Sequence, residues 1–211
     1  MIMKKILFIS AILLIASNSL FSQNIGIIVG GSNAKMLVSG DGVETSINDS
    51  INSKLSFRGG FAFEGVLIPK KFYLQLGLLT QGKGMLSPDG KEGASINYGQ
   101  LELDLKYKFH FDSDDVYYLY LSVGGYIGGA YNGSEWTGSD VKKIEFGSDP
   151  KFFYRPVDVG MNFGAGIGLG QFQISYTYGM GLKNISTIEV DNFALTNSVH
   201  SITLGFYFTT N

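Results

Sequence analysis

Apolar and polar residues alternate along most of the chain. The clearest case is its last segment, where Ile202, Leu204, Phe206 and Phe208 are separated by small or polar residues. Because successive side chains of a strand point to opposite faces, this period of two predicts amphipathic β-strands. Eight such strands are expected, at residues 24–35, 57–68, 72–85, 96–111, 116–131, 157–169, 172–182 and 199–209.

The composition of the two strand faces favours a closed barrel. In segment 96–111, the odd positions from Leu101 to Phe111 are apolar or aromatic, whereas the even positions from Glu102 to His110 are charged or histidine. In segment 157–169, large apolar residues alternate mostly with glycines. A solvated face would accept large polar side chains, whereas a glycine-rich face suits the crowded interior of a small barrel. A soluble periplasmic β-sandwich is the alternative fold.

The connections between the expected strands alternate in length. Residues 69–71, 112–115 and 170–171 form short connections, and residues 36–56, 86–95, 132–156 and 183–198 form long ones. Outer-membrane barrels have short periplasmic turns and long extracellular loops, and an even strand number places both termini in the periplasm. We therefore predict an all-β fold, an eight-stranded antiparallel transmembrane up-and-down β-barrel.

The N-terminal residues have the features of a cleavable secretory signal. Lys4 and Lys5 precede an apolar run to Ala16, which is shorter than the roughly 20 residues of a membrane helix. We predict a signal peptide at residues 1–22 and a barrel domain at residues 23–211, located in the outer membrane of a Gram-negative bacterium. With no Cys, neither a lipid-anchored N-terminus nor a disulfide framework is possible, and the net charge of -2 argues against nucleic-acid binding.

Charged residues on the inward face form a candidate lumenal cluster. Its members are Arg58, Glu64, Glu102, Asp104, Lys106, Lys108 and Asp158. Eight strands leave room for little more than side chains, and buried charges must be paired. We interpret this cluster as a structural polar plug, with a water or proton path through a narrow porin-like channel as the alternative.

The sequence contains few candidates for catalysis or metal binding. The glycines of residues 164–170 lie within an expected strand and do not form a phosphate-binding loop. His110 and His200 are expected at opposite ends of the barrel, so we predict no metal and no cofactor. One pair, Ser198 and His200, has the spacing of a nucleophile and its base, with Glu189 or Asp191 to orient the imidazole. The expectation is no enzymatic activity, with a lipid-modifying enzyme as the alternative.

Aromatic and basic residues in the connection 132–156 are candidates for partner binding. They are Trp136, Phe152, Phe153, Tyr154 and Arg155. Exposed aromatic and arginine side chains are common binding anchors, and here they are expected either to bind a protein or glycan partner or to form a lid over the barrel mouth. Aromatic residues near the turns, including Phe172 and Phe208, predict contact with the membrane interface, and Phe208 also with the barrel-assembly machinery.

Several of these segments resemble a known family. FYLQLGLLTQGKG, INYGQLELDLKYKF, ISYTYGMGLKNI and LGFYF resemble strands three, four, seven and eight of the PorT-like, outer membrane protein beta-barrel family of small porin-like proteins. The resemblance extends from Asn24 to Phe208. It implies an outer-membrane barrel in contact with lipid and lipopolysaccharide, with no general catalytic residues. One branch assists a secretion system, so the resemblance implies a non-enzymatic envelope, surface-interaction or secretion-accessory role.

Overall fold

The computed structural model describes residues 24–42, 46–111, 116–149, 151–188 and 192–209. The expected signal peptide, together with Glu189 and Asp191, lies outside these residues. Eight long strands and two short elements form the described chain. The long strands are β1 (Asn24–Ser39), β2 (Asn52–Ile68), β3 (Phe72–Leu86), β4 (Glu92–His110), β5 (Tyr117–Thr137), β7 (Val157–Leu169), β8 (Phe172–Gly181) and β9 (Ala194–Thr209). The short elements are α2 (Ser46–Ser50) and β6 (Asp140–Lys143).

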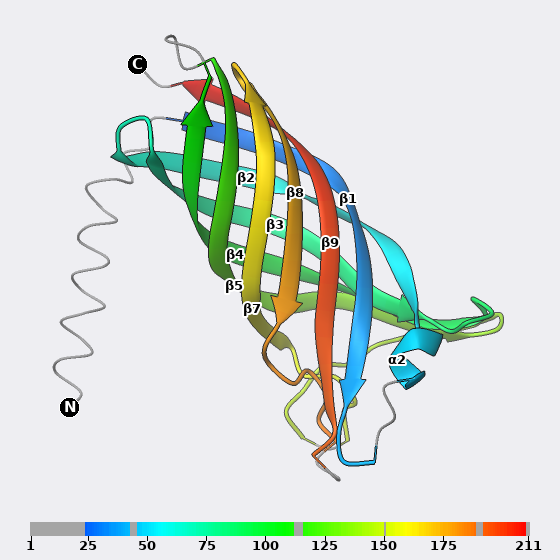
Figure 1. Cartoon of the computed structure of the whole chain (residues 1–211). Helices are drawn as coiled ribbons and strands as arrows, with labels where there is room; N and C mark the ends of the chain where they lie inside the picture. Colours follow the sequence, from blue (N-terminus) through cyan, green and yellow to red (C-terminus); the bar gives the residue numbers. More distant parts are fainter. Residues whose placement is uncertain (1–23, 43–45, 112–115, 150, 189–191, 210–211) are drawn as a thin grey trace, which may run out of the picture.

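The eight long strands close into an antiparallel ring (Figure 1). Each strand pairs with its neighbours in the chain, and β1 pairs with β9 from Asn24↔Thr209 to Ser39↔Ala194. Closure leaves no strand edge in the ring, which satisfies the backbone hydrogen bonds as a bilayer requires. The predicted eight-stranded barrel is confirmed, and the alternative of a β-sandwich is wrong.

Short and long connections lie at opposite ends of this ring. The connections β2–β3, β4–β5 and β7–β8 lie at one end, called here the turn end, together with the start of β1 and the end of β9 (Figure 1). At the tightest of them, Gly170 has a φ of 64°, which favours glycine. The long connections and α2 lie at the other end, called here the loop end.

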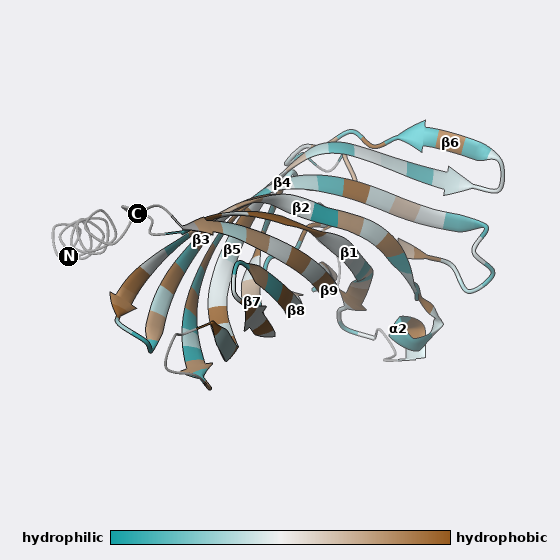
Figure 2. Cartoon of the chain, turned by 90° about the horizontal axis from the view of Figure 1, so that it is seen from above, coloured by the Kyte–Doolittle hydropathy of each residue, from teal (hydrophilic) through white to brown (hydrophobic). Residues whose placement is uncertain are grey.

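Strand positions were predicted well near the turn end and less well near the loop end. The bounds of β7 agree exactly with the predicted segment 157–169. By contrast, β5 continues six residues past the predicted end at residue 131, to Thr137, and pairs there with β6 (Figure 2). The prediction that residues 132–156 form a loop throughout is therefore wrong, because backbone pairing continues where the apolar alternation has ended.

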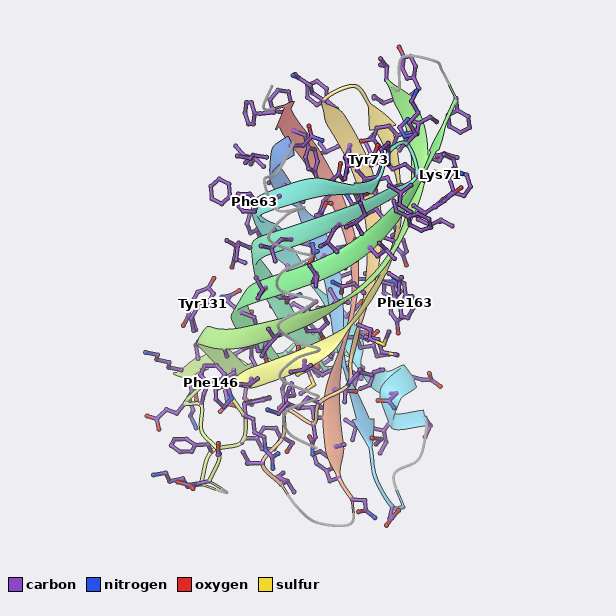
Figure 3. The ribbon with its side chains drawn as sticks, turned by 90° about the vertical axis from the view of Figure 1, so that its left-hand side faces the viewer. Phe63, Lys71, Tyr73, Tyr131, Phe146 and Phe163 are labelled. Carbon is purple, nitrogen blue, oxygen red and sulfur yellow. The ribbon has the colours of Figure 1, made fainter. Side chains whose placement is uncertain are left out.

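The two faces of the sheet are divided as the alternation predicts. Outward-facing Leu101, Leu103 and Leu105 are each about two-fifths exposed, whereas Glu102 and Asp104 between them are buried. Phe63 and Phe163 point outward from opposite sides of the barrel (Figure 3). An apolar exterior around a charged interior is the arrangement expected of a barrel surrounded by lipid.

Glycines on the inward face of β7 make room for tyrosines of β5. A Cβ placed at Gly166 would lie 2.5 Å from the ring of Tyr120, and one at Gly168 would lie 2.0 Å from the ring of Tyr118. These pairs are cross-strand neighbours in the ring. The glycine-rich face is therefore required by the tyrosines that fill the interior. None of the helices among the described residues is long and apolar enough to span a membrane.

Candidate functional site: the barrel interior and the loop-end groove

All seven residues of the predicted lumenal cluster lie inside the barrel and are buried. They are joined by Lys83 of β3, which the sequence analysis missed and which is 1% exposed. Lys83 has the same odd parity on this strand as the buried Gln75 and Gln81, so the period of two, followed to the end of the strand, would have found it. The set then holds four cations (Arg58, Lys83, Lys106, Lys108) and four anions (Glu64, Glu102, Asp104, Asp158), and its formal charges cancel.

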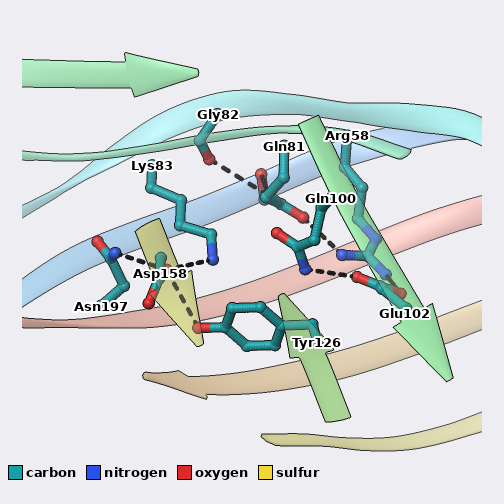
Figure 4. A network of polar contacts seen from close by, with 10 residues as sticks. Arg58, Gln81, Gly82, Lys83, Gln100, Glu102, Tyr126, Asp158 and Asn197 are labelled. Carbon is teal, nitrogen blue, oxygen red and sulfur yellow. Dashed lines mark hydrogen bonds and ion pairs between the residues drawn. The ribbon is translucent and has the colours of Figure 1, made fainter. Parts of the chain in front are cut away.

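Two of the interior ion pairs connect strands that are not neighbours in the ring (Figure 4). Lys83 Nζ is 2.8 Å from Asp158 Oδ2, which also accepts hydrogen bonds from Asn197 at 2.8 Å and Tyr126 at 3.3 Å. Arg58 contacts Glu102 at 2.6 Å and donates to Gln81, also at 2.6 Å. Glu102 also accepts from Gln100 at 2.7 Å, and Lys83 Nζ lies 4.0 Å from the centroid of the Tyr126 ring. Each charge therefore has both an opposite charge and a neutral contact, which helps to make a buried ion pair tolerable.

The remaining interior ion pairs share one carboxylate near the turn end. Glu64 accepts from Lys106 at 3.2 Å and from Lys108 at 2.5 Å. The two ammonium groups also lie against tyrosine rings, Lys106 at 4.5 Å from the centroid of Tyr120 and Lys108 at 3.8 Å from that of Tyr73. Such cation–π contacts supplement the ion pairs where water is excluded. Asp104 Oδ1 is buried without a hydrogen-bond partner among the described residues, as are Arg58 Nε and Asp158 Oδ1.

Little space remains between these side chains. The two interior cavities described for the barrel measure about 10 Å³ and about 20 Å³. A cavity of this size accommodates about one water molecule. The charged side chains therefore leave little free space around these two cavities, as a structural polar plug would.

An apolar cap covers the plug at the loop end. Its inward-facing strand residues are Met36, Ala94, Ile96, Tyr98 and Leu195, and its loop residues are Ile144, Tyr154 and Ile185. Burial and the nearby Glu135 carboxylate raise the pKa of the Tyr154 phenol to about 12. The connections that follow β6 and β8 therefore close the barrel mouth.

The five predicted loop-binding residues are divided between this cap and its surroundings. Tyr154 is buried in the cap, and Phe153 packs its ring against Tyr154 but is 42% exposed. Phe152 accepts a hydrogen bond from Thr187 of the β8–β9 connection, and the Arg155 backbone donates to Ile185. Trp136 lies on strand β5, which corrects its placement in a loop.

Trp136 borders a groove that the sequence analysis did not find. The groove has a volume of about 510 Å³ and lies at the loop end between α2, the end of β1, the β3–β4 turn and β5. Its walls include Ile47, Ile51, Val38 and Met85, and the carboxylates of Glu92 and Glu135 also line it. An apolar groove with a few polar groups is the usual form of a ligand site.

The position of α2 at this groove is set by one side chain. Asn48 Oδ1 accepts from Val38 N at 2.8 Å, and Asn48 Nδ2 donates to Val38 O at 2.9 Å. The Asn48 amide thus pairs with the β1 backbone as a neighbouring strand would. The wall formed by Ile47 and Ile51 is therefore attached to the barrel, although α2 has only five residues.

Ser198 and His200 do not form the hydrogen bond that a nucleophile and its base require. Ser198 Oγ donates to Tyr178 Oη at 3.5 Å, and His200 Nδ1 lies 2.6 Å from Tyr176 Oη. The Tyr178 ring packs on the His200 ring with centroids 4.9 Å apart. Among the described residues, no group of three or more His, Asp or Glu side chains could hold a metal ion.

The comparisons with known proteins agree with the class that this architecture defines. Residues 21–187 match the family described as "Outer membrane protein beta-barrel domain", and the chain belongs to that family. The family places the protein in the outer membrane. No protein with a curated functional description matches the chain.

Similar solved structures are small outer-membrane barrels. Ail, the attachment invasion locus protein of Yersinia pestis, is 11% identical with a TM-score of 0.40, covering 89% of this chain and 99% of Ail. Neisserial surface protein A is 11% identical with a TM-score of 0.45, covering 87% and 97%. The N-terminal barrel of Pseudomonas aeruginosa OprF is 10% identical with a TM-score of 0.39, covering 89% and 98%. At these values the likeness carries no functional conclusion.

Proposed function

We propose that the protein is a sealed, non-enzymatic outer-membrane barrel whose loop end faces the cell exterior and binds a partner at the groove. The groove carries this proposal, because its walls are held by the Asn48–Val38 hydrogen bonds and its lining combines apolar and acidic side chains. The filled interior supports a role other than transport. The separate contacts of Ser198 and His200 support a role other than lipid modification.

In this proposal the protein is exported and assembled first, and the finished barrel then contacts lipid and a partner. Residues 1–22 direct export, and the barrel-assembly machinery inserts the folded strands. The apolar exterior contacts outer-membrane lipid and lipopolysaccharide. A protein or glycan binds at the groove. The PorT-like resemblance favours one form of this role, in which the partner is a component of a secretion machinery.

Cysteine labelling tests the orientation, because the natural chain has no Cys. A membrane-impermeant maleimide added to intact cells is expected to label Asp140→Cys on exposed β6 and not Lys71→Cys at the turn end. Labelling of Lys71→Cys alone would place the loop end in the periplasm and contradict the proposal.

Maleimide labelling of cysteine variants also tests whether the partner binds at the groove. Ser50→Cys places a label on the groove wall, whereas Asp140→Cys places it outside the groove. Binding of intact cells to immobilised protein and glycan surfaces is expected to be lost after labelling at position 50 and kept after labelling at position 140. Equal binding by both labelled variants would show that the groove is not the recognition site.

A further inference from the structure

A polar patch lies on the outward face of β1 and β9, where their apolar exterior ends. On β9 the outward residues change from Leu204 and Ile202 to His200 and Ser198. On β1 they change from Val29 and Gly31 to Asn33 and Lys35, since Ser32, Ala34 and Met36 are buried inside. The change occurs at the same level on both strands, and it defines one boundary of the apolar band.

The four polar residues of this patch are direct neighbours. Asn33 pairs with His200, and Lys35 pairs with Ser198. Side chains at paired positions on one face have Cβ atoms about 4.5–5.5 Å apart, so Asn33, Lys35 and His200 can contact a single group, whereas Ser198 is only 9% exposed. The hydroxyls of Tyr176 and Tyr178 border the patch from β8 through their hydrogen bonds with His200 and Ser198.

The patch is rich in hydrogen-bond donors. His200 Nδ1 lies 2.6 Å from Tyr176 Oη, and in the tautomer in which this hydroxyl donates, the ring proton lies on Nε2, which is then a donor. Asn33 adds an amide and Lys35 an ammonium group, whereas Ser198 is 9% exposed and donates its hydroxyl to Tyr178. The residues of β1, β8 and β9 named on this face include no carboxylate. Ammonium and N–H donors are the groups that bind phosphate oxygens.

Exposed apolar residues lie beside the patch. Leu55 pairs with Asn33 and is 78% exposed, and Ile202, beside His200 on β9, is 65% exposed. Because the chain belongs to an outer-membrane family, these side chains face hydrocarbon while the polar patch lies at headgroup level. We propose that the outward face of β1 and β9 binds the phosphorylated headgroup of a membrane lipid through Asn33, Lys35 and His200. The acyl chains of this lipid lie along Leu55, Ile202 and Leu204.

The test measures lipid binding to the folded barrel in detergent micelles by native mass spectrometry. The probes are lipid A carrying its phosphates, the same lipid after enzymatic removal of the phosphates, and inorganic phosphate. The variants are Lys35→Met, which removes the charge, and the matched control Lys142→Met on exposed β6. Methionine is chosen at position 35 because an apolar side chain is tolerated on a face that meets lipid. A band shift on boiling verifies that each variant is folded.

The wild type is expected to bind phosphorylated lipid A about tenfold more tightly than the dephosphorylated lipid, as one charge-assisted contact predicts. Lys35→Met should remove this difference and Lys142→Met should keep it. Asn33→Leu should also weaken the binding of phosphorylated lipid A. It provides a second variant if Lys35→Met does not fold. Equal affinity for both lipids would overturn the proposal. So would displacement of lipid A by an equal concentration of inorganic phosphate, because the site would then bind a free anion.

Discussion

Lys83 and Asp158 connect β3 to β7 across the barrel interior, with Nζ and Oδ2 2.8 Å apart and both side chains almost fully buried. The two strands are not neighbours in the ring. The pair therefore crosses the space that a channel would need to keep open. Removing one partner leaves the other charge buried and uncompensated, which costs more than the pair itself contributes.

We expect Lys83→Met to lower the free energy of unfolding by about 3–5 kcal/mol, the usual cost of breaking a buried pair. The double variant Lys83→Met/Asp158→Leu should recover most of this loss. Urea unfolding in lipid vesicles, followed by the band shift on boiling, measures the free energy of unfolding of the single and the double variant. Lys142→Met on exposed β6 serves as the control for a lost lysine. A loss of less than about 1 kcal/mol, typical of surface pairs, would contradict the assignment of Lys83 to a dry interior.

The barrel is expected to carry no ionic current. Its described interior cavities hold about one water molecule each, and the cap around Tyr98 and Ile96 covers the loop end. Planar-bilayer recordings should show no discrete steps for the wild type, Lys106→Gln or Asp104→Asn. Steps whose ion selectivity changes in Lys106→Gln would establish the channel alternative. Band-shift analysis of the same vesicles shows that folded protein was inserted.

The glycine–tyrosine packing predicts a difference between two glycine-to-alanine substitutions. Gly166→Ala should destabilise the barrel by about 1–3 kcal/mol, because its Cβ overlaps the Tyr120 ring. Gly99→Ala on the outward face of β4 should have little effect, since no atom lies within 4 Å of its added Cβ. Urea unfolding compares the two variants. Equal effects would indicate that the inward glycines are not needed for packing.

The Tyr154 phenol predicts a loss of stability in strong base. Its pKa in the folded protein is raised from 10.0 to about 12, so the folded state keeps a proton that the unfolded state loses between these values. The free energy of unfolding contributed by this group is therefore constant below pH 10.0 and falls as the pH rises towards about 12. Tyr154→Phe should reduce this slope relative to wild type, as measured by unfolding at a series of pH values. An identical slope would show that Tyr154 is not buried in the cap.

Sequence reasoning predicted the barrel and most of its interior because one physical constraint acts on every residue between the turns. A side chain there faces either lipid or the lumen, and whether its position along the strand is odd or even determines which of the two it faces. Lys83 was missed although it obeys this parity, because the charged set was not extended to the end of the third strand. The bounds of β7 were predicted correctly because its apolar alternation runs from Val157 to Leu169 and the tight turn at Gly170 follows it.

Beyond the apolar band this constraint ends. Residues of β5 past Tyr131 are polar or glycine apart from Trp136 itself, so no apolar alternation marks the strand that carries Trp136. The groove is built from residues of β1, α2, β3, β4 and β5, and these residues are distant in the chain. Its formation depends on the Asn48 side chain binding the β1 backbone, and a single asparagine in a polar connection gives no distinctive signal.

The pairing of β1 with β9 has a consequence for biogenesis. The first and last described residues, Asn24 and Thr209, are paired, so the ring is completed only when both ends of the chain are present. Before β1 and β9 pair, the barrel interior is not enclosed. Lys83, Glu64 and their partners are then accessible to water. A chain truncated before β9 would expose these charges to lipid, where they are strongly unfavourable. The charged interior thus makes insertion dependent on full-length synthesis, and it discriminates against incomplete chains.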